Sequence, residues 1–106
     1  MRVSKLYVDQ SKIKIHALAS SFNRSKVTIR CLETLFTSDM PDNIDFKVTI
    51  VDDNSDDDTV SLIKLNFRQV NIIKSPGNLF WAGAMRYGWD IIKNEQFNYL
   101  FAFNDD

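Results

Sequence analysis

The sequence has little of several features that would place it in a specialised class of protein. One cysteine, Cys31, excludes an internal disulfide framework and fits a reducing compartment. A net charge of -1 provides no positive field that would attract nucleic acid. No apolar run approaches the roughly 20 residues that cross a membrane, and the amino terminus lacks the apolar stretch of a signal peptide. We therefore expect a cytoplasmic protein without a membrane span, at most associated with the inner face of the membrane.

What is present fits one globular domain, residues 1–106. Of the 106 residues, 44% are hydrophobic and 25% are charged, which suffices for a single hydrophobic core. The acidic residues are almost all aspartate, since Glu33 and Glu95 are the only glutamates. Glutamate suits helices, whereas aspartate suits caps, turns and cation sites. The bias indicates loops in which carboxylates have a function.

Short apolar runs alternate with amphipathic stretches along the chain. Apolar and β-branched runs predict strands over 13–22, 46–51, 70–74 and 99–103. Helical spacing of apolar residues predicts helices over 25–36, 59–67 and 81–93. This order, βαβαβαβ, predicts an α/β fold with a Rossmann-like parallel sheet and flanking helices.

The same periodicities predict which side chains are buried. In the first helix the expected buried stripe contains Val27, Cys31 and Leu35, with Leu32 and Phe36 beside it. In the third helix it contains Trp81, Met85, Trp89 and Ile92, so the two tryptophans are interpreted as core rather than as ligand platforms. The last strand is an unbroken apolar run, which is typical of a strand covered on both faces. The single histidine, His16, is interpreted as a structural residue.

Polar clusters follow the carboxyl ends of all four predicted strands. They cover residues 20–24, 52–58, 75–78 and 104–106. The carboxyl ends of parallel strands lie at one edge of the sheet, and open α/β sheets bind their ligands there. We therefore expect one binding site that is assembled from these four clusters.

The acidic loop, residues 52–58, holds five carboxylates that repel one another unless a cation or hydrogen-bond donors balance them. An EF-hand fits Asp52, Asn54 and Asp56 at its first, third and fifth positions. It fails at the sixth position, which is Asp57 instead of glycine, and at the twelfth, which is Ile63 instead of glutamate. The simpler alternative is a solvated loop in which Asp57 or Asp58 caps the next helix.

Two further clusters suit a phosphorylated ligand. The segment 104–106 follows an apolar strand, and its oxygens would hold Mg²⁺ or Mn²⁺ with phosphate and water as the other ligands, unless it is a frayed tail. All three glycines fall within 77–88, where they allow close approach of backbone to a ligand or to the sheet. Arg86 in this segment is either a diphosphate contact or part of a solvated helix face. Asn23 and Arg24 either contact a nucleotide or open the first helix.

Taken together, four segments resemble the amino-terminal half of a family 2 glycosyltransferase with the GT-A fold. The segment Ser21-Phe22-Asn23-Arg24 is similar to the family's Thr-Tyr-Asn-Arg, and residues 51–59 are similar to its Val-Asp-Asp-Gly-Ser-Thr-Asp-Gly-Thr. Residues 78–88 resemble a segment that runs from Asn to Asn-x-Gly, and residues 103–106 resemble the Asp-x-Asp motif. The run Leu-Phe-Trp-Ala-Gly-Ala-Met resembles a rhamnosyltransferase-like branch. The resemblance implies a truncated GT-A fold.

The resemblance also implies a ligand and a set of contacts. The ligand would be a UDP- or dTDP-linked sugar with a divalent metal, Mg²⁺ or Mn²⁺. Asp52 and Asp57 would contact the base and ribose, with the backbone of Ser21 and Asn23 framing the base. The remaining implied contacts to the nucleotide-sugar are Arg24, Asp53, Asn78, Arg86 and Asp105, and those to the metal are Asp106 and Asn104. Asn104 replaces the family's first Asp, and Phe80 and Arg86 replace its Gly and Asn.

Related enzymes continue past the metal motif with the acceptor-binding half and the catalytic base. No catalytic residue is therefore assigned within this chain, and the base is expected beyond Asp106. We expect that the chain alone does not turn over. A sheet edge left bare by the missing half would favour a homodimer.

Two alternatives come from other classes of protein. Residues 50–54 also resemble the start of a response-regulator receiver, a Mg²⁺-dependent phosphoacceptor in which Asp105 would be the candidate acceptor. Against this, a full strand and helix precede the acidic pair here. The other alternative is a non-catalytic interaction module, which binds no nucleotide.

Overall fold

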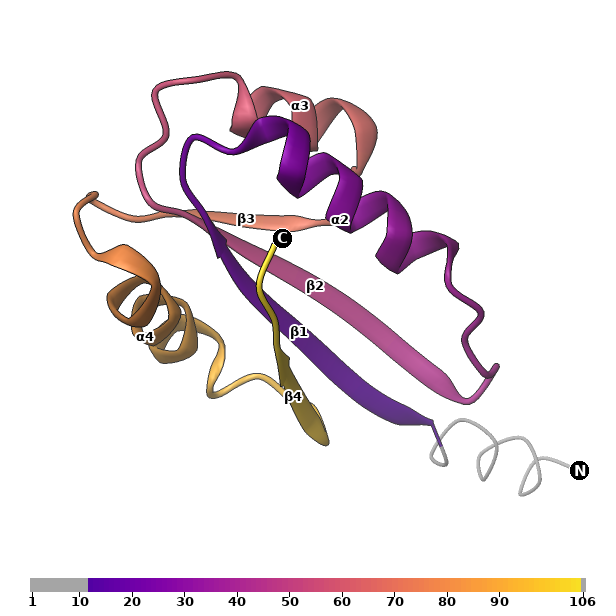
Figure 1. Cartoon of the computed structure of the whole chain (residues 1–106). Helices are drawn as coiled ribbons and strands as arrows, with labels where there is room; N and C mark the ends of the chain where they lie inside the picture. The colour runs from indigo at the N-terminus through magenta and orange to yellow at the C-terminus, as the bar shows by residue number, and fades with distance from the viewer. Residues whose placement is uncertain (1–11, 106) are drawn as a thin grey trace, which may run out of the picture.

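A computed structural model of the chain describes residues 12–105. The elements alternate regularly along the sequence (Figure 1). They are β1 (Ile13–Ser21), α2 (Ser25–Thr37), β2 (Ile44–Asp52), α3 (Thr59–Asn66), β3 (Asn71–Lys74), α4 (Phe80–Ile92) and β4 (Tyr99–Ala102). This order confirms the predicted α/β fold, with β2 beginning two residues earlier than the apolar run alone indicated.

The four strands form one parallel sheet in the order β3-β2-β1-β4. Ser21 at the end of β1 pairs with Asp52 at the end of β2, and Asp52 pairs with Lys74 at the end of β3. Ala102, the last residue of β4, pairs with Leu18. The carboxyl ends of the strands therefore share one edge, which is the condition for the expected site.

Helices cover both faces of the sheet (Figure 1). Leu32 of α2 and Ile63 of α3 pack with Ala17 and Ala19 on one face, and α4 packs against Leu18 and Val51 on the other. Successive residues of a strand point to opposite faces, so β1 contributes alternate side chains to two separate cores. Both cores depend on the central strands β1 and β2.

Helix α4 lies very close to the sheet because one of its contact residues is glycine. A Cβ atom on Gly88 would lie 2.5 Å from Cγ2 of Val51 and 2.9 Å from Cδ1 of Leu18. Ala84, one turn earlier, is also buried. The third glycine of the 77–88 cluster thus serves close packing on the sheet.

This close contact corrects the predicted burial of the two tryptophans. Trp81 and Trp89 are 53% and 39% exposed. The buried face of α4 holds Ala84 and Gly88 beside the predicted Met85 and Ile92, and the two tryptophans lie outside it. Helix α2 needs a similar correction: Thr28 and Leu32 are its buried residues, whereas Val27 is exposed and Cys31 is half-buried.

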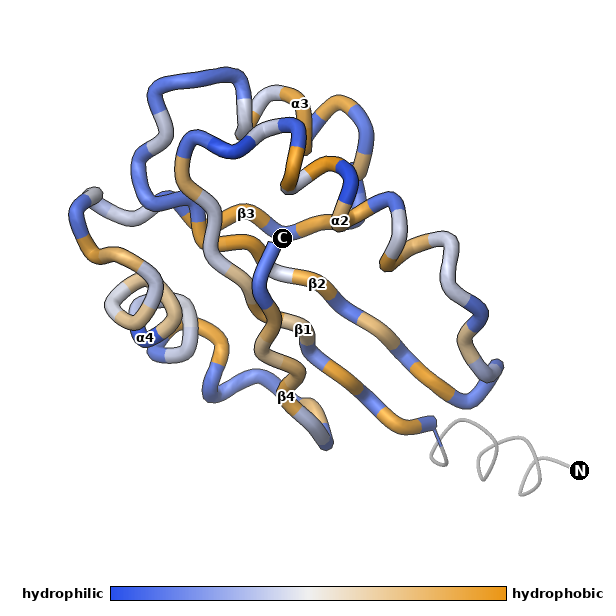
Figure 2. Tube along the Cα trace, in the orientation of Figure 1, coloured by the Kyte–Doolittle hydropathy of each residue, from blue (hydrophilic) through white to orange (hydrophobic). Residues whose placement is uncertain are grey.

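The prediction that β4 is covered on both faces is wrong. All four residues of β4 are exposed. Within residues 12–105, β4 pairs only with β1, and the helices pack over the central strands. Figure 2 shows β4 as an apolar segment at the margin of the fold. An apolar strand is therefore left at the edge of the sheet.

Candidate functional site

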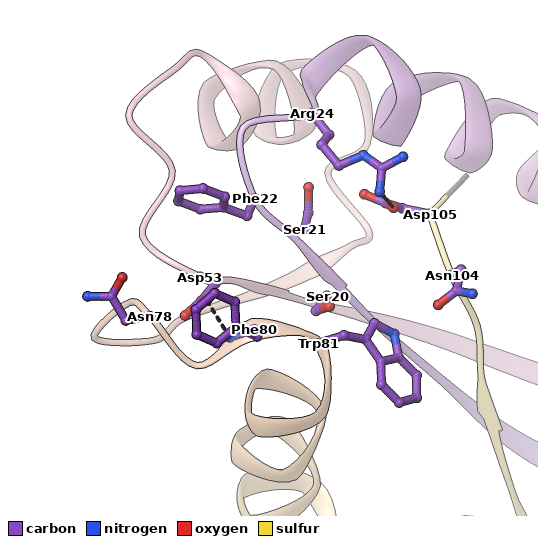
Figure 3. Close-up of a pocket in the computed structure, with 10 residues that line it drawn as sticks. All are labelled: Ser20, Ser21, Phe22, Arg24, Asp53, Asn78, Phe80, Trp81, Asn104 and Asp105. Atoms are coloured by element: carbon purple, nitrogen blue, oxygen red, sulfur yellow. Dashed lines mark hydrogen bonds and ion pairs between the residues drawn. The ribbon is translucent and has the colours of Figure 1, made fainter.

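A cleft of about 370 Å³ lies at the carboxyl edge of the sheet (Figure 3). Its walls come from the ends of β1 and β2, the start of α4 and the segment after β4. The lining residues are Ser20, Ser21, Phe22, Arg24, Asp53, Asn78, Phe80, Trp81, Asn104 and Asp105. Each of the four polar clusters of the sequence contributes at least one residue to the cleft, together with the start of α4.

Asp53 connects the end of β2 to the beginning of α4. Its buried carboxylate accepts hydrogen bonds from Ser75 Oγ at 2.6 Å and from the amides of Leu79 and Phe80 at 3.0 and 3.1 Å. The first amides of a helix have no partner within the helix, and a negative charge there is favourable. Asp53 therefore holds the wall of the cleft that α4 provides.

At the start of α4 the backbone takes a left-handed conformation, which residues with a side chain rarely adopt. Asn78 and Phe80 have positive φ angles of 62° and 58°. For a bulky residue such as Phe80 this conformation costs on the order of 1–3 kcal/mol and persists only where neighbouring contacts impose it. The two hydrogen bonds to Asp53 supply that constraint. The Phe80 side chain is left 78% exposed in the cleft.

Asp105 is held on the opposite side of the cleft. Thr28 Oγ1 donates a hydrogen bond of 2.7 Å to Asp105 Oδ2, and Arg24 Nη1 lies 3.3 Å from Oδ1. Ser21 Oγ and Thr28 Oγ1 are 2.8 Å apart. The buried carboxylate thus has a positive partner and a hydroxyl donor, which compensates its charge. Figure 3 shows Arg24 reaching toward Asp105 above the cleft.

The acidic loop is balanced by hydrogen-bond donors. The fully buried carboxylate of Asp52 accepts bonds from the amide and hydroxyl of Ser55 at 3.0 and 2.5 Å. Asn23 Oδ1 accepts bonds from the amides of Asp56 and Asp57 at 2.7 and 3.3 Å. Asn23 has a positive φ of 49°, and its own amide donates to Ser55 Oγ at 2.9 Å. The loop is thereby fixed against the end of β1.

Asp57 makes the helix-capping contact that the solvated-loop alternative anticipated. Its carboxylate accepts hydrogen bonds from the amide and the hydroxyl of Thr59, the first residue of α3. The Thr59 hydroxyl is the main cause that lowers the pKa of Asp57, and backbone donors lower it further. Asp58 makes no capping bond through its side chain. Asp57 therefore caps the start of α3.

The predicted site residues divide between the cleft and its surroundings. The cleft brings together Ser21, Arg24, Asp53, Asn78, Asn104 and Asp105. Asn23, Asp52 and Asp57 order the adjacent acidic loop and do not line the cleft, and Arg86 is exposed on α4. Asp106 lies outside the described residues.

Four further lining residues had no individual role predicted: Ser20 and Phe22, which belong to the predicted 20–24 cluster, and Phe80 and Trp81. Trp81 was assigned to the core because it fits the helical stripe of α4. Phe80 follows the turn at 75–78 and was noted only because it replaces the family's glycine. Thr28, which positions Asp105 from outside the cleft, was also missed, because a threonine within a helical stripe gives no sign of a distant partner.

Within residues 12–105 no group of three or more His, Cys, Asp or Glu side chains could hold a metal ion. Asn104 lines the cleft and is exposed, so its amide oxygen is accessible to a ligand. Asp105 already binds Arg24 and Thr28.

None of the helices within residues 12–105 has the length and hydrophobicity of a membrane span.

Two solved structures share this fold over most of the chain. The structure of S. aureus TarS 1–349 matches with a TM-score of 0.72 and 20% identity, covering 89% of this chain and 28% of that chain. The mannosyltransferase PcManGT from Pyrobaculum calidifontis, in complex with GDP-Man and Mn²⁺, matches with a TM-score of 0.64 and 16% identity. That match covers 78% of this chain and 25% of PcManGT. The chain thus spans about a quarter of either structure.

The sequence identifies the family directly. The model of glycosyl transferase family 2 matches residues 18–106, a range that contains every residue of the cleft. No curated protein sequence matches the chain. The family match favours the glycosyltransferase interpretation over a receiver-like phosphoacceptor. The fold is a four-stranded part of a GT-A fold, and the chain belongs to glycosyl transferase family 2.

Proposed function

We propose that this chain is the donor-binding part of a glycosyltransferase and that its cleft binds a nucleotide-diphospho-sugar. The observation that supports this is the position of the cleft. It lies at the carboxyl edge of a parallel sheet, in a chain of a sugar-transferring family, and it is lined by aromatic, amide and charged side chains. Ligands of open α/β sheets bind at this edge.

The acidic loop and the end of β1 would bind the nucleoside. Ser21 and Asn23 would frame the base with their backbone, and Asp52 and Asp57 would face the base and ribose. Because these carboxylates already bond to Ser55 and Thr59, we propose that they act mainly by holding the loop in shape. Polar atoms held rigidly before binding cost less entropy when the ligand arrives.

Arginine side chains would contact the diphosphate. Arg24 lines the cleft beside Asp105 and is partly exposed, so its guanidinium can donate to phosphate oxygens as well as to the carboxylate. Arg86 is a second candidate, exposed on α4. Asn78 lines the other side of the cleft and would donate or accept a hydrogen bond.

A divalent cation, Mg²⁺ or Mn²⁺, would be held by Asp106 and Asn104. In support, the similar PcManGT was solved with GDP-Man and Mn²⁺. The cation would neutralise the charge that builds on the leaving nucleoside diphosphate. Oxygen ligands from a carboxylate and an amide suit both metals.

The acceptor-activating base would lie in another part of the enzyme. An inverting transfer needs a carboxylate that takes a proton from the acceptor. In the described cleft, the oxygens of Asp53 and Asp105 are occupied by donors of the protein. We therefore propose that this 106-residue polypeptide transfers no sugar by itself. Sugar transfer by the purified chain would overturn that proposal.

We also propose that two copies pair through β4. One edge of β4 pairs with β1, the other edge has no partner strand within residues 12–105, and the side chains of β4 are exposed. An unpaired apolar edge strand is a template for pairing with another strand. Light scattering after gel filtration would show a particle of twice the chain mass, and a monomer at all concentrations would rule the dimer out.

Thermal unfolding tests the proposed donor site. The chain is unfolded with UDP, dTDP or GDP, each with and without Mn²⁺. A ligand that binds only the folded state stabilises it by about 2.7 kcal/mol at one hundred times its Kd. A rise in Tm that requires both nucleotide and Mn²⁺ is expected, and the most effective nucleotide identifies the base. No rise at millimolar concentration would contradict the proposal.

A further inference from the structure

Two adjacent aromatic side chains at the start of α4 line the cleft without being buried. Phe80 is 78% exposed and Trp81 is 53% exposed. Trp89, two turns later, instead contacts the ring of Phe97 edge-on. Two large apolar side chains left exposed together at a cleft mark a surface that contacts a partner or a ligand.

The backbone at Phe80 is held in a conformation that glycine would adopt without strain. Its φ is 58°, and its amide and that of Leu79 bind the buried carboxylate of Asp53. The strain is not compensated by packing of the phenyl ring, because most of that ring is exposed. The hydrogen bonds to Asp53 hold the backbone in this conformation, and the exposed ring is left available to contact a ligand. Strained residues gather at binding sites.

The position of Trp81 indicates which part of a ligand it would meet. Figure 3 shows its indole on the side of the cleft where Asn104 and Asp105 lie. The acidic loop, proposed to bind the nucleoside, is fixed to the end of β1 by Asn23. Trp81 therefore lies toward the proposed diphosphate end, where the sugar of the donor is attached, whereas Phe80 lies on the side of Asp53 and Asn78.

We propose that the two rings form an aromatic platform for the donor sugar, with Trp81 stacked on one face of the pyranose ring and Phe80 contacting the sugar from the other side of the cleft. This inference rests on the proposed function. A pyranose has a face of C–H groups that carry slight positive charge, and it complements the negative face of an aromatic ring. Aromatic side chains also provide a large contact area with few rotatable bonds. The platform would thus favour donors whose sugar presents an unbroken C–H face.

Isothermal titration calorimetry that compares nucleoside diphosphates with nucleotide-sugars tests the platform. UDP, dTDP and GDP are compared with UDP-glucose, dTDP-glucose and GDP-mannose, all with Mn²⁺, on the intact chain and on Phe80→Gly and Trp81→Ala. We expect each variant to bind the nucleotide-sugar about tenfold more weakly, while its affinity for the bare diphosphate stays within about twofold. Leu65→Ala removes an exposed apolar side chain from α3, outside the cleft, and is expected to change neither affinity.

Phe80→Gly separates a ligand contact from a structural role. Glycine relieves the positive φ, so the Tm of this variant is expected to equal or exceed that of the original chain. A lower Tm would assign the ring to the fold and overturn the inference. Equal losses for diphosphate and nucleotide-sugar, or no loss at all, would also overturn it while leaving the proposed function intact. Failure of the original chain to bind any of the six compounds would overturn both.

Discussion

The hydroxyl of Thr28 donates a 2.7 Å hydrogen bond to Oδ2 of Asp105, across 77 positions of the sequence. Both residues are buried, and the same hydroxyl lies 2.8 Å from Ser21 Oγ. One threonine thereby links the end of β1, the first turn of α2 and the segment after β4. It sets the position of a carboxylate in the cleft without lining the cleft itself.

Thr28→Val is expected to destabilise the chain because it removes this hydroxyl while keeping the shape of the side chain. Asp105 loses its hydroxyl donor, and Ser21 loses its buried partner. Leaving buried polar groups without partners costs about 1–3 kcal/mol. The free energy of unfolding, measured by urea denaturation, should fall by that amount, and binding of nucleotide with Mn²⁺ should weaken.

Thr34→Val is the matched control, since it makes the same change on the exposed side of the same helix. The Thr34 hydroxyl bonds only to the carbonyl of Arg30 one turn earlier. An exposed substitution of this kind is expected to change the free energy of unfolding by less than about 0.5 kcal/mol. Similar losses in both variants would show that helix propensity, rather than the contact with Asp105, is responsible.

Asp53→Ala is expected to cause a larger loss. The carboxylate accepts bonds from Ser75, Leu79 and Phe80, and alanine leaves all three donors without it. We expect the free energy of unfolding to fall by about 3 kcal/mol, with α4 losing the anion at its first turn. Chemical denaturation followed by tryptophan fluorescence measures the loss. Asp58→Ala, an exposed change in the same loop, should leave the stability nearly unchanged.

The order of the elements could be predicted because each strand and helix leaves a local periodic pattern. The buried face of the helices could not be predicted as well. In α2 two stripes lie side by side, one apolar through Val27 and Cys31 and one through Thr28 and Leu32, and the second faces the sheet. A polar residue is buried there because its hydroxyl has partners on β1 and after β4. Those partners come from the tertiary fold.

The candidate site shows the same limit. Asp53, Asn78 and Asp105 were predicted because parallel strands end at one edge and acidic clusters follow them. Phe80 was seen only as a departure from a family pattern, since its exposure depends on a hydrogen bond from its amide to Asp53. No local pattern reports a bond between residues so far apart in the sequence. Polar residues at strand ends are therefore easier to predict than side chains whose exposure or contacts depend on the tertiary fold.

Gly88→Ala is expected to push α4 away from the sheet. The added Cβ would lie 2.5 Å from Cγ2 of Val51 and 2.9 Å from Cδ1 of Leu18. Because the backbone fixes the position of a Cβ, these contacts are relieved only if the helix or the two side chains move. Overpacking of this kind costs about 1–3 kcal/mol, which outweighs the better helix propensity of alanine. Thermal unfolding measures the loss. Gly83→Ala, where the methyl meets only the side chain of Leu79 at 3.0 Å, should cost less, and the reverse ranking would contradict the packing described.

His16 makes the stability of the chain depend on pH. It is buried, its Nε2 lies 2.6 Å from Thr49 Oγ1, and its Nδ1 lies 3.6 Å from Glu95 Oε1. Burial is the largest effect and lowers the pKa of His16 below 6.5; Glu95 raises this pKa, and Lys47 lowers it. The unfolded chain therefore takes up this proton at a higher pH than the folded chain does.

The free energy of unfolding is thus expected to decrease as the pH falls below 6.5 and to stop responding to this group below the folded pKa. The chain has one histidine, so a slope in this range is assigned to it. His16→Gln keeps a polar group beside Thr49 and removes the titration, and its stability should be flat between about pH 7 and the onset of carboxylate protonation. Urea denaturation across this range measures both curves. If the original chain gained stability on acidification, the attraction to Glu95 would outweigh burial, and the sign argued here would be wrong.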